Sequence, residues 1–164
     1  MTPLPAFIVR LFFILFLFSA QNSWARGSEE WSKTDPAINL THIFEGSINR
    51  KGKATGFHHR PQGIDLPAAR LKKLLSGPNN AGVYTAIIEI LDKRSGEWRE
   101  KFSSLFPDHL PRNKLILAIL DAYKNRTQTT GRKWSSRSPL GFTISGYILK
   151  DGRIITAYPI YQPD

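Results

Sequence analysis

The feature that most limits what this chain can fold into lies at its N-terminus, where an uninterrupted apolar run follows a single positive charge. Arg10 precedes residues 11–18, a stretch that contains no polar side chain. Such a run is too short to cross a bilayer comfortably, and Ser23 and Ala25 are small residues of the kind that signal peptidase prefers. We therefore expect residues 1–25 to be a cleaved signal peptide rather than a retained anchor, and the protein to be periplasmic or secreted.

The part that remains after cleavage is long enough for one domain and too short for two. Removal of the signal peptide leaves 139 residues. Residues 26–37 are polar and are expected to form a flexible leader, and residues 38–164 are expected to form the folded domain. The sequence contains no cysteine, which excludes disulfide bonds, thiolate nucleophiles and cysteine-ligated zinc. An exported domain of this kind must be stabilised by packing alone.

The charge balance favours a polyanionic partner. The chain has 23 Lys and Arg residues against 13 Asp and Glu, and only Arg10 lies in the segment expected to be removed. A surplus of this size suits nucleic acid, although an anionic membrane face or a wall polymer would also satisfy it.

Hydrophobic periodicity predicts helices in two segments. In residues 65–75, Pro67 suits the first helical position, and Leu71, Leu74 and Leu75 form a stripe at helical spacing. Residues 111–124 carry a longer apolar stripe and predict an amphipathic helix that covers a sheet.

Alternating patterns predict strands in two neighbouring segments. In residues 82–91, the predicted buried face contains Tyr84, Ala86, Ile88 and Ile90. Residues 97–106 alternate in the same way, with Trp98, Phe102 and Phe106 on one face and Arg99, Lys101 and Ser103 on the other. Residues 126–138 are cationic and polar and are expected to be a loop.

The C-terminal segment predicts a β-hairpin. Asp151-Gly152 suits a two-residue type I′ turn, in which both positions need a positive φ. This turn pairs Ile148 with Ile155, Tyr147 with Thr156, and Ser145 with Tyr158. The hydroxyl-bearing residues Thr143, Ser145, Tyr147, Thr156 and Tyr158 then share one face, either as the wall of a site or as an ordinary solvated sheet face. The predicted fold is α+β, with two main helices packed on a twisted antiparallel sheet that includes this hairpin.

The histidines suggest acid–base chemistry. Of the four histidines, His42, His58 and His59 fall in one cation-rich stretch, and His109 lies apart. RNA transesterification needs one group to accept the proton of the 2′-hydroxyl and another to protonate the leaving 5′-oxygen, and imidazole can do either. Lys101 is well placed to stabilise the charge that develops on the phosphate oxygens.

A divalent metal site is the main chemical alternative. It would use His42, His58 or His59 together with an acid such as Glu45 or Asp65. The sequence has no His-Glu-x-x-His motif, no helical histidine pair at i, i+4 and no cysteine, and the neighbouring cations would repel a divalent ion. We therefore expect no bound metal.

Four short motifs in order along the chain carry a family resemblance. They are Thr41-His42-Ile43-Phe44-Glu45-Gly46, Gly56-Phe57-His58, the strand with Lys101-Phe102-Ser103-Ser104, and Thr156-Ala157-Tyr158-Pro159. Together they resemble the bacterial EndoU endoribonuclease domains of secreted and contact-dependent toxins, and the resemblance covers residues 39–161.

The resemblance implies an EndoU/BECR-like fold and cleavage of RNA, often at uridine, to leave a 2′,3′-cyclic phosphate. It implies that His42 and His58 are the acid–base pair and that Lys101 stabilises the phosphate, with Thr156 and Tyr158 in contact with phosphate or base. It implies no required cofactor, although some members are stimulated by Mn²⁺. A toxin of this kind would also need an immunity or inhibitor protein as a partner.

Some assignments stay open at this point. Spacing alone does not separate His58 from His59, and His58 is favoured because the family histidine directly follows Gly-Phe. Lys93, Lys114 and Arg99 are alternatives to Lys101 as the functional cation. The residues expected to bind substrate around the catalytic set are Lys53, His59, Arg60, Ser145 and Tyr147.

Two other functions compete with a metal-independent endoribonuclease. An exported, non-enzymatic binder of nucleic acid or another polyanion would use the same cations and show strongly salt-dependent binding without a cleavage product. A metal-dependent phosphodiesterase would lose its activity in a chelator.

Overall fold

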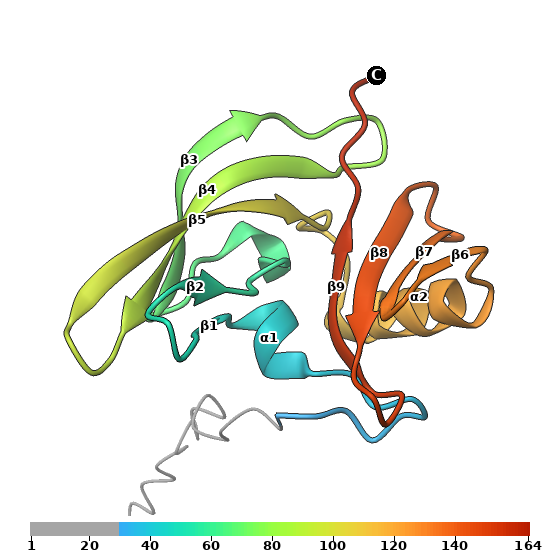
Figure 1. Cartoon of the computed structure of the whole chain (residues 1–164). Helices are drawn as coiled ribbons and strands as arrows, with labels where there is room; N and C mark the ends of the chain where they lie inside the picture. Colours follow the sequence, from blue (N-terminus) through green and yellow to red (C-terminus); the bar gives the residue numbers. More distant parts are fainter. Residues whose placement is uncertain (1–29) are drawn as a thin grey trace, which may run out of the picture.

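The computed structural model describes residues 30–164, so the expected signal peptide lies outside the described residues. Two α-helices and three antiparallel sheets form two lobes (Figure 1), which confirms the predicted α+β class. The elements are α1 (Leu40–Phe44), β1 (Ser47–Ile48), β2 (Ala54–Thr55), the 3-10 helix η2 (Pro61–Gly63), β3 (Ala69–Ser76), β4 (Tyr84–Asp92), β5 (Glu97–Leu105), α2 (Arg112–Lys124), β6 (Gln128–Thr130), β7 (Lys133–Arg137), β8 (Thr143–Ile148) and β9 (Ile154–Pro159). Within residues 30–164, no helix is long and apolar enough to cross a membrane.

The first lobe is built on the sheet β3-β4-β5, with the short pair β1-β2 packed beside it. Tyr84, Ala86, Ile88 and Ile90 of β4 are buried on one face, as their alternation predicts. They pack against apolar side chains that include Phe57, which is fully buried. The predicted strands at residues 82–91 and 97–106 are therefore confirmed as β4 and β5, which pair with each other in antiparallel register.

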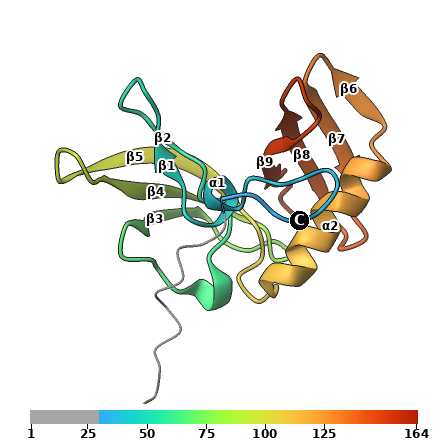
Figure 2. The ribbon, with the colours of Figure 1, turned by 90° about the horizontal axis from the view of Figure 1, so that it is seen from below.

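The second lobe contains the sheet β6-β7-β8-β9 and α2, which lies across one face of that sheet (Figures 1 and 2). Leu115 and Ile119 of α2 pack in a core that also contains Trp134 of β7 and Ile144 of β8. The predicted amphipathic helix is thus confirmed. The prediction of one continuous sheet is wrong, because β4 and β5 belong to one sheet and β8 and β9 to another.

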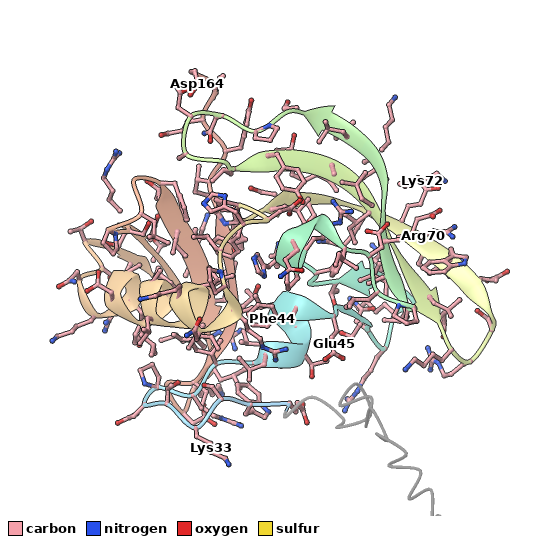
Figure 3. The ribbon with its side chains drawn as sticks, turned by 180° about the vertical axis from the view of Figure 1, so that it is seen from behind. Lys33, Phe44, Glu45, Arg70, Lys72 and Asp164 are labelled. Atoms are coloured by element: carbon pink, nitrogen blue, oxygen red, sulfur yellow. The ribbon has the colours of Figure 1, made fainter. Side chains whose placement is uncertain are left out.

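The helix predicted over residues 65–75 is wrong, because residues 69–76 form β3 at the edge of the first sheet. Register shifts between Leu71 and Lys73, and again between Leu74 and Ser76, break the two-residue alternation that would have identified a strand. Leu, Lys and Arg are also good helix formers, so pairing with β4 overrides the local preference. Two cross-strand ion pairs hold the edge strand on its neighbour, from Arg70 to Glu89 at 2.8 Å and from Lys72 to Glu89 at 3.1 Å. Figure 3 labels both cationic residues.

Residues 126–138 are also more ordered than expected, since they contribute β6 and β7 rather than a loop. Short polar strands of this kind show little hydrophobic alternation, and β7 is identified by its pairing with β6 on one side and β8 on the other. Trp134 is its one large buried side chain, at 1% exposure.

The C-terminal strand pair has the predicted register at its centre and a different turn. Tyr147 pairs with Thr156 and Ser145 with Tyr158, whereas Ile148 pairs with Ile154 instead of Ile155. Of the two predicted turn residues, only Gly152 has a positive φ, of 88°. Its N–H donates to the carbonyl of Leu149 at 3.1 Å, which is the pattern of a type I turn followed by a glycine bulge.

Residues 30–36, part of the expected leader, contact the domain. The N–H of Ser32 donates to the carbonyl of Ile38 at 2.8 Å, and Trp31 forms a β-bridge with Asn39. The guanidinium of Arg153 lies 4.2 Å from the centre of the Trp31 ring. The N–H of Asn39 also donates to the carbonyl of Ile154 at 2.9 Å, so the chain that leads into α1 is held against β9.

A close backbone approach between α1 and the segment after β2 links the first lobe to the second. The N–H of Phe57 donates to the carbonyl of His42 at 2.8 Å, and that of His58 donates to the carbonyl of Ile43 at 2.7 Å. Gly56 makes this approach possible, because it has a φ of +75° and a Cβ there would lie 2.1 Å from the His42 carbonyl oxygen.

We predict that Gly56→Ala lowers the free energy of unfolding by about 3 kcal/mol or more, because the new methyl group forces the two backbones apart. The matched control is Gly96→Ala, since Gly96 has a φ of +74° but no atom lies within 4 Å of the position that a Cβ would take there. That variant should lose only about 1 kcal/mol. Urea denaturation of both variants measures the difference, and equal losses would contradict the role given to the close approach.

Candidate active site

A cavity of about 640 Å³ lies between β5, the edge strand of the first sheet, and β9 of the second. All five residues predicted to be catalytic line it, namely His42, His58, Lys101, Thr156 and Tyr158. They come from α1, the segment after β2, β5 and β9, which meet near the centre of Figure 1. None of the residues that line the cavity carries a carboxylate.

Short local structure orients the two histidines. The Oδ1 of Asn39 caps α1 by accepting the N–H of His42 at 2.8 Å, which fixes the turn that carries the His42 side chain. The ring centroids of His42 and His58 are 5.9 Å apart, and those of His58 and Tyr158 are 5.6 Å apart. The three rings therefore form a continuous row along the wall of the cavity.

Hydrogen bonds on one side of His58 define which nitrogen can exchange a proton. Its Nδ1 lies 3.1 Å from the carbonyl oxygen of Ser104 and 3.2 Å from the Oγ of Ser103. A carbonyl can only accept, so Nδ1 carries the hydrogen, and the Ser103 hydroxyl can donate to the carbonyl of Phe57 at 3.0 Å. The Nε2 of His58 is then the atom that can exchange a proton with a ligand.

Lys101 reaches the same network from the middle of β5. Its Nζ donates to the carbonyl of Gly56 at 2.9 Å and lies 3.4 Å from the Oγ of Ser103. Burial lowers the pKa of Lys101 to about 8. The ammonium is therefore mostly charged at neutral pH, and no acid among the cavity residues neutralises it.

Both cavity histidines are held neutral in the absence of a ligand. Burial and then the charge of Lys101 lower the pKa of His42 to about 4. The same two causes lower the pKa of His58 well below its ordinary value, His42 adds to the effect, and the Ser104 carbonyl partly opposes it. Thr156 adds a buried Oγ1 that has no hydrogen-bond partner within residues 30–164. An anion in this cavity would meet a cation and two imidazoles that gain protons more easily once it binds.

None of the five residues expected to bind substrate lines the cavity. His59 is fully buried against Phe44 and does not line the cavity. Arg60 pairs with Asp65 at 2.8 Å and donates to the Gly63 carbonyl at 2.6 Å, so it serves the fold of the η2 segment.

The other three residues of that group are also absent from the cavity lining. Lys53 is exposed in the loop before β2, and Tyr147 is 42% exposed on β8. Ser145 is buried at 1% exposure and donates to the carbonyl of Trp134 at 3.0 Å.

The three alternative cations are likewise placed elsewhere. Lys93 is exposed in the β4–β5 turn, Lys114 is exposed on α2, and Arg99 pairs with Glu97 on the surface. Only Lys101 of the four candidates lines the cavity.

Sequence reasoning missed the supporting serines. Ser103 was placed on the same face as Lys101 but was given no role, and Ser104 contributes a carbonyl to His58 and a hydroxyl bond to the Pro159 carbonyl of β9. The signal for Ser103 was its position two residues after Lys101 on a strand, whereas a backbone carbonyl such as that of Ser104 leaves no sequence signal. Phe102 was also unexpected, since it is 58% exposed at the rim of the cavity rather than in a core.

The same region lacks the donor set that a metal ion needs. Within residues 30–164, no group of three or more His, Asp or Glu side chains is arranged to hold a metal ion. Glu45 and Asp65, the acids considered for such a site, do not line the cavity.

A basic, carboxylate-free cavity that combines two imidazoles with an ammonium suits a phosphodiester and defines a nuclease-type domain. The chain belongs to the bacterial EndoU nuclease family, which it matches over residues 37–161. It is also similar to a protein named Toxin from Bacillus cereus, with 34% identity over 124 residues, or 73% of this chain. The chain covers 22% of the length of that relative. No solved structure matches this chain significantly.

We predict that Lys101→Met raises the pKa of His42, because removal of the ammonium removes one of the two causes that depress it. Imidazole NMR titration of the labelled protein measures the change. His59 is an internal control, since burial and Arg112 rather than Lys101 lower its pKa to about 4. An unchanged His42, or an equal rise at His59, would show that Lys101 does not act directly on the histidine pair.

Proposed function

We propose that the protein is an exported endoribonuclease that cleaves RNA by metal-independent transesterification and leaves 2′,3′-cyclic phosphate ends. The observation that carries this proposal is the convergence of His42, His58 and Lys101 on one acid-free cavity. The family match supports nuclease activity, and the choice of RNA and of this reaction rests on the chemistry of these three side chains.

In the proposed reaction, one histidine accepts the proton of the 2′-hydroxyl while the 2′-oxygen forms a bond to phosphorus. The bond from phosphorus to the 5′-oxygen breaks, and the other histidine protonates the leaving oxygen. The products are a 2′,3′-cyclic phosphate and a free 5′-hydroxyl. At His58 the exchanging atom is Nε2, because Nδ1 is held by Ser103 and Ser104 in either protonation state.

The cationic side chain supplies the charge that this reaction needs. Extra negative charge develops on the non-bridging oxygens as the fifth bond to phosphorus forms, and a preorganised ammonium stabilises that charge. Lys101 is held for this role by the Gly56 carbonyl. The bound phosphate also raises the pKa of the neighbouring histidines, so that one of them can hold the proton that the leaving group requires.

Thr156 and Tyr158 complete the proposed site. The Oγ1 of Thr156 is buried without a partner, so a small rotation of this side chain toward the cavity would let it bond a phosphate or base oxygen. Tyr158 extends the row of rings on which a base such as uracil can stack. Mn²⁺ is proposed at most as a stimulant, without a site among the cavity residues.

The physiological role that we propose is that of a toxin. The similarity to the Bacillus cereus protein named Toxin supports this role, as does the expected signal peptide. A cell that produces an exported ribonuclease of this kind would need an inhibitory partner protein or rapid secretion.

We expect the protein to cleave a uridine-containing RNA in the presence of EDTA, and His42→Ala and His58→Ala to lower the rate by about 10²-fold or more. Mass spectrometry of the product ends identifies the cyclic phosphate. Exposed His109 supplies the control, His109→Ala, which should act at the wild-type rate. His59→Asn should retain cleavage in the fraction that folds, because His59 does not line the cavity.

Two results would contradict the proposal. Salt-sensitive RNA binding without any cleavage product would identify a polyanion-binding protein instead. Cleavage that EDTA abolishes would identify a metal-dependent phosphodiesterase.

A further inference from the structure

A second hollow, of about 440 Å³, lies beside the catalytic cavity on the β6–β9 sheet. Its polar lining consists of Thr130, Lys133, Ser135, Thr143, Ser145 and Gln162. Ile160 lines both this hollow and the cavity, so the two are neighbours across the chain that follows β9. Both have the size of hollows that bind small ligands.

Strand register makes the two hollows parts of one continuous face. Tyr158, which lines the cavity, pairs directly with Ser145 of β8, which lines the second hollow. Ser145 in turn pairs with Ser135 of β7. Side chains of directly paired residues lie on the same side of a sheet, so a polar path leads from Tyr158 across β8 to β7. The helix α2 covers the opposite face of this sheet (Figure 3).

The charged side chain on this path has no partner among the residues that the structure describes. Lys133 is exposed, and within residues 30–164 its side-chain ammonium makes no hydrogen bond or ion pair. No carboxylate lines the hollow. On the first sheet, by contrast, Arg70 and Lys72 are paired with Glu89. The hollow therefore presents a free ammonium among hydroxyls, which is the chemistry that binds a phosphate group.

We propose that the second hollow binds the RNA chain beyond the scissile phosphate, with Lys133 paired to the next phosphate group. The proposal rests on the proposed ribonuclease function and extends it, since it makes the substrate a single-stranded oligonucleotide rather than an isolated dinucleotide. A strand that crosses from Tyr158 over Ser145 to Lys133 places successive phosphates in the two hollows.

The test compares a dinucleotide with a single-stranded RNA of about eight nucleotides that has the same cleavage step. A dinucleotide has only the scissile phosphate, so it cannot reach Lys133. We expect Lys133→Ala to lower kcat/KM about tenfold on the octanucleotide and to leave the dinucleotide unchanged. The slope of log kcat/KM against log salt should also fall by about 0.7 on the octanucleotide, as for the loss of one phosphate contact to a single strand.

The matched control is Lys124→Ala, which removes another exposed lysine, from α2 on the covered side of the sheet. It should alter neither substrate. Equal effects of the two variants on the octanucleotide, or an equal loss on both substrates for Lys133→Ala, would overturn the assignment of the second hollow. A wild-type protein that cleaves the dinucleotide but gains nothing from added length would also overturn it. A wild-type protein that cleaves neither substrate would overturn the ribonuclease function itself.

Discussion

The close approach of the Gly56–His58 backbone to α1 is the interaction on which the rest of the site depends. It brings two histidines that are sixteen positions apart into one wall, through hydrogen bonds to the carbonyls of His42 and Ile43. It also turns the Gly56 carbonyl toward Lys101, which holds the ammonium beside the same wall. The N–H of Phe106 donates to the carbonyl of His58 at 2.8 Å, so the end of β5 is fixed to the same segment.

This arrangement leaves the cavity with a positive potential that none of the residues lining it neutralises. Burial and the Lys101 charge keep the pKa of His42 near 4, and no cavity carboxylate relieves the positive potential. Buried histidines and lysines with a purely structural role are usually paired with an acid. Because His42, His58 and Lys101 have no such partner in the cavity, they indicate a site for an external anion. Protonation of the buried histidines at low pH opposes folding, because their unfolded pKa values are higher. Stability is therefore lost as the pH falls from about 6.5 toward 4.

The sequence predicted those parts of the structure that depend on local pattern. Alternation identified β4 and its buried face, and helical spacing identified α2. The segment that became β3 was misread, since its leucines suit a helix and its register shifts hide the strand period. The division into two sheets was also beyond local reasoning, because alternation identifies a strand but not the strands with which it pairs.

The site residues likewise divide into those that a local sequence motif identifies and those that only the fold identifies. His42, His58, Thr156 and Tyr158 lie in short motifs and were found directly, and the structure brings all four to one cavity. Lys101 was separated from its alternatives only by its position on β5. The Ser104 carbonyl, which fixes the tautomer of His58, could not be predicted, because every residue has a carbonyl and only the fold decides which one faces a ring.

The central claim is that two histidines divide the two proton transfers at one phosphate. A uridine-containing dinucleotide with sulfur in place of the leaving 5′-oxygen tests it directly, because a thiolate leaves without being protonated. We expect one of the variants His42→Ala and His58→Ala to cleave this substrate at close to the wild-type rate, while the other stays impaired. Equal impairment of both variants on the sulfur substrate would contradict a divided acid and base role for the pair.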